Sequence, residues 1–179
     1  MIEHDDHDHQ GCRHSALARA EARCDELGLR LTAQRRRVLH ALTASHIPMS
    51  AYEIMDRLGE GERRPSPISV YRALDFLVAN RFAHRIESRN AFLACVHDHT
   101  DPAETAGEPA LVFLLCETCG AAAEAEPPAL PSLLSGIAEE TGFTVRSSVF
   151  EIRGTCARCR AAGLAPSPPS AQLPSGDPA

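Results

Sequence analysis

The sequence predicts an α+β protein in which an N-terminal winged helix-turn-helix is followed by a small α/β domain with a four-cysteine zinc site. Two observations carry this prediction. Residues 67–95 change from a helical hydrophobic pattern to two short runs of period two around a polar turn, the order of elements in a winged helix. Further along, two Cys-x-x-Cys motifs are separated by 36 residues, which indicates a zinc site closed by two knuckles.

The 179 residues suffice for one domain or two small ones. We expect a winged-helix domain over residues 15–95 and an α/β domain over residues 96–160. Residues 1–14 are His-rich and aperiodic, and residues 161–179 are rich in Pro, Ser and Ala, so both are expected to be disordered. No run approaches 18 apolar residues, and the acidic start is no signal peptide, which predicts a cytoplasmic protein without a membrane partner.

The cysteine count and the charge distribution narrow the function. Seven cysteines without a secretion signal favour metal ligands and core thiols over disulfides. The net charge of −6 is uneven, because residues 15–94 hold 13 Arg and nine acids whereas residues 95–179 hold four Arg and 11 acids. Positive charge is thus confined to the candidate DNA-binding half, as phosphate contact requires. The sequence has no lysine, which suits bidentate contacts but is also explained by a high-GC genome.

The first two predicted helices follow from their caps. Ser15 is expected to cap a helix that ends at Gly28 and carries Cys24 on its apolar face as a small core residue. Thr32 caps the next helix, whose first turn holds Arg35, Arg36 and Arg37. These three cations oppose the helix dipole. Contact with a phosphate backbone explains them, and a solvated basic face explains them equally well.

The next two helices complete the helix-turn-helix. Ser50 and Glu53 form a capping box for the third helix. Ser66 caps the fourth, with Pro67 at its first position. In a winged helix this last helix enters the major groove and the wing lies along the DNA backbone. The side chains that we expect to contact DNA are Tyr52, Ser69, Tyr71, Arg72, Arg35 and Arg36.

The C-terminal half predicts strands on either side of a helix. Residues 111–115 form a buried strand, and residues 121–126 a returning strand. A helix follows within residues 127–141 and stops at Gly142. Residues 143–152 are predicted as a further strand, which leads to the second knuckle.

The four knuckle cysteines are the strongest chemical signal. Together they can bind one tetrahedral zinc through four thiolates, which leaves no open position for chemistry. The intervening strand-helix-strand can fold back to close the site, and the metal would supply much of the folding energy of so small a domain. A redox role for either motif is the alternative. The residues concerned are Cys116, Cys119, Cys156 and Cys159.

A second group of metal-binding residue types lies at the junction of the two halves. A mixed site assembled from separate segments holds metal more weakly than four thiolates and exchanges it more readily, which is what a sensor needs. The group consists of His84, Cys95, His97, His99 and Glu124.

Several motifs resemble the ferric uptake regulator family, and in particular its zinc uptake regulator branch, over about residues 15–160. They are LTAQR from Leu31, SAYE from Ser50, SVYRALDFL from Ser69, HRIES from His84, NAFLAC ending at Cys95, and the two knuckles. The resemblance implies a cytosolic homodimer with a winged-helix domain, a C-terminal α/β dimerisation domain and one structural zinc per chain. It also implies a second zinc at the hinge, which makes the protein a repressor of zinc-importer genes.

Carried over by position, the structural zinc falls on the four knuckle cysteines, and the regulatory zinc on His84, Cys95 and Glu124. Tyr52 and Arg72 match DNA-contacting positions of the family. Ala33 replaces a usual Pro. The His that normally precedes the strand at Leu111 is missing, so the fourth regulatory ligand is expected to be His97 or His99.

Competing functions make different demands on the sequence. An iron, manganese or peroxide sensor of the same family would use a harder, His- and carboxylate-rich site than one containing Cys95. A deaminase-type zinc enzyme needs a His-x-Glu base beside a Pro-Cys-x-x-Cys knuckle, and the chain has neither. A zinc-storage protein would have no use for the winged-helix half. We therefore expect a DNA-binding regulator with about two zincs per chain, and neither an enzyme nor a binder of a small-molecule substrate.

Overall fold

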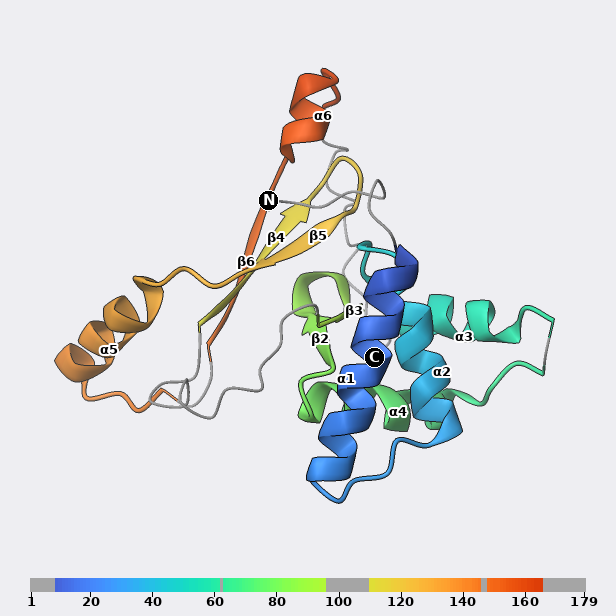
Figure 1. Cartoon of the computed structure of the whole chain (residues 1–179). Helices are drawn as coiled ribbons and strands as arrows, with labels where there is room; N and C mark the ends of the chain where they lie inside the picture. Colours follow the sequence, from blue (N-terminus) through green and yellow to red (C-terminus); the bar gives the residue numbers. More distant parts are fainter. Residues whose placement is uncertain (1–8, 62, 96–109, 146–147, 166–179) are drawn as a thin grey trace, which may run out of the picture.

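The protein consists of a helical N-terminal half and a C-terminal half built on a second sheet (Figure 1). A computed structural model describes residues 9–61, 63–95, 110–145 and 148–165. None of the helices described is long and apolar enough to cross a membrane. The α+β prediction is confirmed.

The N-terminal half is a winged helix-turn-helix. Its helices are α1 (His9–Glu26), α2 (Ala33–Leu42), α3 (Ala51–Gly59) and α4 (Pro67–Ala79). The same half contains a small antiparallel sheet. Its strands are β1 (Met49–Ser50), β2 (Ala83–Ile86) and β3 (Ala91–Ala94), and their order in the sheet is β1-β3-β2. The turn of the wing is a 3-10 helix, η1 (Glu87–Arg89), and Asn90 closes it with a left-handed φ of 45°.

The predicted caps of three helices are confirmed. The Thr32 hydroxyl accepts a hydrogen bond from the backbone N–H of Arg35, and the Ser66 hydroxyl accepts one at the start of α4. Ser50 and Glu53 form both hydrogen bonds of the capping box. These local signals explain why the sequence places α2, α3 and α4 correctly.

The first helix begins earlier than predicted. α1 starts at His9, so its backbone already includes residues expected to be disordered, whereas residues 1–8 lie outside the described chain. Ser15 does not cap this helix, because it lies inside α1, where its hydroxyl accepts a hydrogen bond from the Arg19 guanidinium one turn later. Cys24 is buried as predicted, and the helix ends at Glu26, two residues before the predicted end at Gly28.

One hydrophobic core holds the helical half together. It combines side chains of α1, α2, α3 and α4 with residues of the wing, and burial of such side chains contributes about 1.5–3 kcal/mol each. The largest fully buried members are Leu39, Leu42, Ile54, Met55, Leu74 and Leu77. The recognition helix α4 is therefore fixed against α2 and α3.

The C-terminal sheet has the order β5-β4-β6. β4 (Leu111–Cys116) is central, pairs antiparallel with β5 (Ala122–Ala125) and pairs parallel with β6 (Val149–Gly154). α5 (Leu130–Thr141) makes the crossover, and the short α6 (Ala157–Ala161) follows β6. The predicted strand over 143–152 is wrong at its start, since β6 begins at Val149. Phe143 is 69% exposed and follows Gly142, whose left-handed φ of 66° ends α5.

A second hydrophobic cluster joins the two halves. It packs the inner face of the wing against β4 and β5, so the wing belongs to both halves. Its members are Ile86, Leu93, Leu111, Phe113, Leu115 and Ala122.

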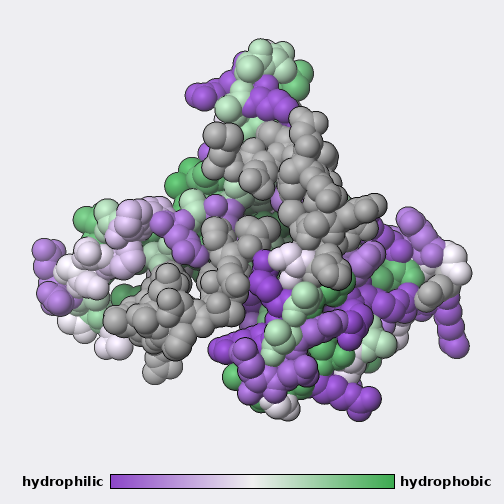
Figure 2. All heavy atoms as spheres, in the orientation of Figure 1, coloured by the Kyte–Doolittle hydropathy of each residue, from purple (hydrophilic) through white to green (hydrophobic). Residues whose placement is uncertain are grey.

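Part of the C-terminal half leaves apolar side chains in contact with solvent. Helix α5 stands apart from the helical half (Figure 1) and has no buried residue. Leu133 and Ile137 on α5 and Val149 and Ile152 on β6 are all more than half exposed. Figure 2 shows hydrophobic and hydrophilic atoms mixed over α5 and α6, whereas hydrophilic atoms predominate on the visible surface of the helical half.

Candidate metal centres and nucleic-acid interface

The four knuckle cysteines meet in one cluster at the end of the C-terminal sheet. Cys116 ends β4, and Cys156 follows β6, its parallel neighbour, so the two knuckles leave the sheet at the same edge. All four sulfur atoms lie within 4.8 Å of one another, and the Cys116–Cys159 and Cys119–Cys156 sulfurs are each 4.0 Å apart. A disulfide bond is about 2 Å long, so these are four free thiols.

The spacing of the sulfurs fits a tetrahedral zinc. Zn–S bonds of about 2.3 Å place the sulfurs of a tetrahedron about 3.8 Å apart. Three of the four cysteines are buried, and the sulfurs also accept backbone hydrogen bonds, such as that from the Cys156 N–H to the Cys116 sulfur at 3.4 Å. Backbone donors around a thiolate are what a structural zinc site supplies.

The thiols of this cluster differ in acidity. Burial raises the pKa of Cys116, but the backbone N–H groups of Cys119, Cys156 and Thr118 outweigh burial and lower it to about 6. Burial and the neighbouring thiols raise the pKa of Cys159 to about 12, and burial is also the main cause of the raised pKa of Cys119. The backbone N–H groups therefore favour the thiolate of Cys116, whereas burial favours the neutral thiols of Cys119 and Cys159.

The second candidate centre lies between the wing and the C-terminal sheet. His84 on β2, Cys95 directly after β3 and Glu124 on β5 place one ligand atom each within 4.8 Å of one another. The His84 Nε2 is 3.5 Å from a Glu124 carboxylate oxygen, and the Cys95 sulfur is 4.0 Å from the other. The Glu124 side chain is only 1% exposed, and the His84 ring packs against Phe113. A buried N/S/O cluster of this kind fits Zn²⁺.

A cavity of about 40 Å³ adjoins this cluster. Cys95 and Glu124 line it together with His46, from the loop between α2 and β1. The carbonyl oxygen of His46 accepts a hydrogen bond from the N–H of Ala122 at 2.9 Å, which holds this loop beside β5. His97 and His99 lie outside the described residues. No local pattern singled out His46, because only the fold brings its loop to β5.

The predicted DNA-contacting side chains of α3 and α4 are accessible. Tyr52 near the start of α3 is 64% exposed, and Tyr71 on α4 is 40% exposed. Arg72 is exposed, whereas Ser69 is half-buried and donates its hydroxyl proton to the carbonyl oxygen of Ser66 at 2.7 Å. The outward face of α4 is thus available to a ligand.

The arginines at the start of α2 have partners within the protein. Arg35 lies over the Phe76 ring, with its guanidinium carbon 3.4 Å from the ring centroid. Arg36 pairs with Glu21 of α1, and Arg37 donates to the carbonyl oxygen of Leu58. Arg36 remains 50% exposed, so it is the most accessible of the three. These contacts within the protein stabilise the three cations at the start of α2, and the sequence alone did not indicate them.

Comparison with known proteins places these features in a family. The model of the ferric uptake regulator family matches residues 26–153. The chain belongs to the ferric uptake regulator family. Within this family, the chain is 36% identical over 143 residues to the zinc uptake regulation protein of Escherichia coli, covering 80% of each chain. It is 26% identical over 137 residues to the zinc uptake regulation protein of Mycobacterium tuberculosis, covering 74% of this chain and 96% of the relative.

Solved structures of the family resemble the whole fold. A zinc uptake regulator in complex with zinc and DNA superposes with a TM-score of 0.76 at 34% identity, covering 84% of this chain and 97% of the other. Holo XcZur superposes with a TM-score of 0.71 at 39% identity, covering 82% and 98%. Each fit covers more than four fifths of this chain and therefore extends over both the helical half and the C-terminal sheet.

Proposed function

We propose that this member of the ferric uptake regulator family is a zinc-responsive transcriptional repressor, which binds operator DNA as a zinc-loaded dimer and controls zinc uptake genes. The observation that carries the proposal is the cluster of His84, Cys95 and Glu124 at the junction of the DNA-binding and C-terminal halves. Relatives named as zinc uptake regulation proteins support it. In this role the protein is a transcription regulator and not an enzyme.

The position of the cluster explains how zinc acts. His84 and Cys95 belong to the wing, and Glu124 belongs to the C-terminal sheet, so all three reach one ion only when the wing lies on the sheet. Zinc therefore binds this arrangement more tightly than others, and it shifts the population toward it by that difference in affinity. A dimer with both winged helices so placed can insert two copies of α4 into successive major grooves.

The ligand chemistry favours zinc over the other metals of the family. A thiolate is a soft ligand that suits zinc, whereas iron and manganese sensors use histidine and carboxylate ligands. Cys95 is 5% exposed and faces the carboxylate of Glu124. The alternative, a sensor of iron, manganese or peroxide, would have to use this same thiol.

The fourth ligand of the regulatory zinc has three candidates. His97 and His99 lie shortly after Cys95 in the sequence, and His46 lines the cavity beside Cys95 and Glu124. Replacing each with Ala in the cobalt-loaded protein distinguishes them. The variant that lacks the true ligand changes the visible absorption of the cobalt site, whereas the other two variants keep the wild-type spectrum.

The four knuckle cysteines hold the second, structural zinc, which brings the content to about two per chain. This metal closes the proposed C-terminal domain, residues 96–160, whereas the regulatory zinc sits where that domain meets the winged-helix domain, residues 15–95. Four thiolates retain metal when a mixed site has released it. Metal analysis before and after mild chelation should therefore find about two zincs and then one.

The exposed apolar residues of α5 and β6 are the proposed homodimer surface. Leu133, Ile137, Val149 and Ile152 are each more than 55% exposed in the single chain. Exposed apolar side chains on both α5 and β6 are candidates for burial in a protein–protein interface. Two-fold pairing of this surface leaves both winged helices free to bind a palindromic operator.

DNA contact is assigned to the outward side chains of the helical half. Tyr52, Tyr71 and Arg72 are exposed, with Ser69 at the start of the same face. Arg72 on α4 can read guanine bidentately. Arg35 and Arg36, at the start of α2, can reach only phosphate.

Selection of bound fragments from genomic DNA, with and without zinc, tests the function. We expect enrichment of promoters of zinc-import genes only when zinc is present, and no enrichment with the Cys95→Ser variant. Cells are expected to contain the protein in the cytoplasm. Enrichment that depends on iron and not on zinc would contradict the proposal.

A further inference from the structure

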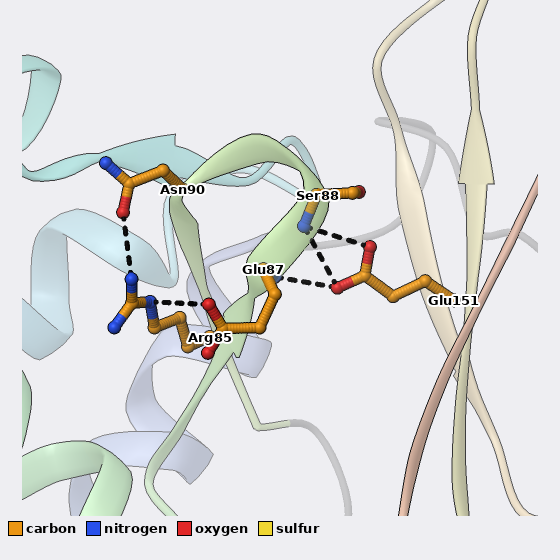
Figure 3. A network of polar contacts seen from close by, with 5 residues as sticks. All are labelled: Arg85, Glu87, Ser88, Asn90 and Glu151. Atoms are coloured by element: carbon orange, nitrogen blue, oxygen red, sulfur yellow. Dashed lines mark hydrogen bonds and ion pairs between the residues drawn. The ribbon is translucent and has the colours of Figure 1, made fainter.

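The C-terminal half forms hydrogen bonds with the turn of the wing. In Figure 3 the Glu151 side chain reaches from the C-terminal sheet to the turn between β2 and β3. One carboxylate oxygen of Glu151 accepts hydrogen bonds from the backbone N–H groups of Glu87 at 2.7 Å and Ser88 at 3.4 Å, and the other accepts from Ser88 at 3.2 Å. A residue 63 positions away in the sequence from Ser88 thus binds the turn.

These hydrogen bonds satisfy donors that the turn leaves open. The first N–H groups of a helix have no partner within it. Ile86, at the cap position of η1, has no side chain that can accept a hydrogen bond. Glu151 therefore supplies, from the other half of the protein, the cap that η1 lacks, and its negative charge suits a helix start.

A second contact binds the other end of the turn to the first knuckle. The Arg89 guanidinium donates to the carbonyl oxygen of Gly120 at 2.7 Å and to that of Cys116 at 3.0 Å. Two bonds from one planar guanidinium fix the orientation of the side chain, which a lysine ammonium cannot do. Through Arg89 the wing contacts the backbone of the four-cysteine centre directly.

The outer side of the turn has its own polar contacts. Arg85 donates to the Asn90 side chain at 3.2 Å and pairs with the Glu87 carboxylate at 3.2 Å, and both charged side chains are about half exposed or more. Figure 3 shows this pair facing away from Glu151. Arg85 and the Glu87 carboxylate therefore take no part in the hydrogen bonds that Glu151 accepts from the backbone of the turn.

We propose that Glu151 and Arg89 form a latch that does not include any ligand of the regulatory zinc, and that this latch positions the wing on the C-terminal half and so favours the arrangement that binds the regulatory zinc. The latch is closed in the same structure in which His84, Cys95 and Glu124 lie within 4.8 Å of one another. Two interactions that favour one arrangement strengthen each other. The latch rests on the proposed function in one respect: the arrangement that binds zinc is taken to be the arrangement that binds DNA.

Opening the latch should weaken zinc binding at a site that neither residue touches. We expect Glu151→Gln and Arg89→Lys each to lower the affinity of the regulatory site for zinc by about fivefold or more, the smallest effect usual for coupled sites. Arg89→Lys keeps the charge of the wing, so it separates the latch from simple attraction to DNA. Competition with a chelator, on full-length dimer that retains its structural zinc, measures this affinity without DNA.

Two control variants make the result specific. Glu139→Gln removes the same charge from the exposed surface of α5 and should leave zinc affinity unchanged. Arg85→Ala removes the outer cation of the wing and should weaken operator binding while zinc affinity stays as in the wild type. Circular dichroism verifies that each variant is folded.

Wild-type zinc affinity in both folded latch variants would overturn the latch. So would a loss of operator affinity in Arg89→Lys without any loss of zinc affinity, because Arg89 would then act only on DNA. If the wild-type protein binds zinc at two sites but does not bind DNA in response, the proposed function fails, and the effect of the latch on zinc affinity is still decided by the chelator competition.

Discussion

Replacing Cys95 with serine should separate the sensing of zinc from the stability of the fold. The Cys95 sulfur is 4.0 Å from the Glu124 carboxylate and belongs to the cluster with His84. A serine hydroxyl does not replace a thiolate as a zinc ligand. Loss of a group that only orients a metal ligand lowers metal affinity by about 10–100-fold. Loss of the ligand itself should therefore lower zinc affinity by about 100-fold or more, and a 100-fold change corresponds to about 2.7 kcal/mol of binding free energy.

The effect on folding should be smaller than the effect on zinc. Cys95 is 5% exposed, and burial of a hydroxyl costs about 1–3 kcal/mol when it lacks a full set of hydrogen bonds. The carboxylate of Glu124 can accept one, which places the cost at the lower end. A domain is stable by about 5–15 kcal/mol, so the variant should remain a folded dimer with its structural zinc.

The matched variant is Cys116→Ser, in the other metal centre. A structural zinc contributes about 10–16 kcal/mol to the folding of small zinc domains, which is comparable to the total stability of a domain. Cys116→Ser should therefore lose metal, dimer and stability together. Light scattering, zinc content, thermal unfolding and operator binding with added zinc measure these properties for both variants.

Three results would refute this reasoning. They are unfolding of Cys95→Ser, zinc affinity of Cys95→Ser equal to that of the wild type, and zinc-dependent operator binding by a dimeric Cys116→Ser. The first would make Cys95 structural, the second would remove it from the regulatory site, and the third would remove Cys116 from the structural site.

Three further predictions concern DNA, the dimer and pH. Arg72→Ala should lower affinity for operator by about 1–3 kcal/mol and leave random duplex nearly unaffected, whereas Arg35→Ala should weaken both alike in binding titrations at fixed salt. Ile137→Asp should place a charge in the dimer surface and give a monomer in light scattering; an unchanged dimer would exclude this surface. Since Cys119 and Cys159 have raised pKa values, both are protonated near pH 7, so binding of the structural zinc should release at least two protons. Zinc affinity should then rise about a hundredfold per pH unit, and calorimetry in buffers of different ionisation enthalpy that counts fewer than two protons would contradict the assignment.

Local signals made most of the fold predictable. The side chains of Thr32, Ser50 and Ser66 contact backbone atoms only three residues away, so the sequence alone predicts the starts of α2, α3 and α4. The cluster of the four cysteines was predictable for a similar reason, because each knuckle is a short motif and a strand leads into each of them. The start of α1 was missed, since Ser15 is a good cap by residue type but the helix extends from it back to His9 through polar residues without a hydrophobic pattern.

Contacts between the halves could not be predicted, because no local pattern records them. Glu151 is 64 residues from Glu87, and on its own strand it is one acidic residue among exposed neighbours. His46 and Arg89 likewise gain their partners only when the wing packs on the sheet. His84, Cys95 and Glu124 were singled out as metal-binding residue types at the junction of the halves, and the family resemblance then assigned them to one proposed site.

The parallel pairing of β4 with β6 has a consequence for biosynthesis. Both knuckles leave the sheet at one edge, but the chain between them includes the crossover through α5. The second pair of cysteines therefore emerges from the ribosome well after the first pair. The hydrophobic core of the helical half, whose members all lie before residue 95, can form as soon as that part of the chain is released. Capture of the proposed structural zinc by all four thiolates requires a chain that is complete through Cys159. Zinc is then needed once when the C-terminal half folds, and a second time when the folded protein binds the proposed regulatory zinc.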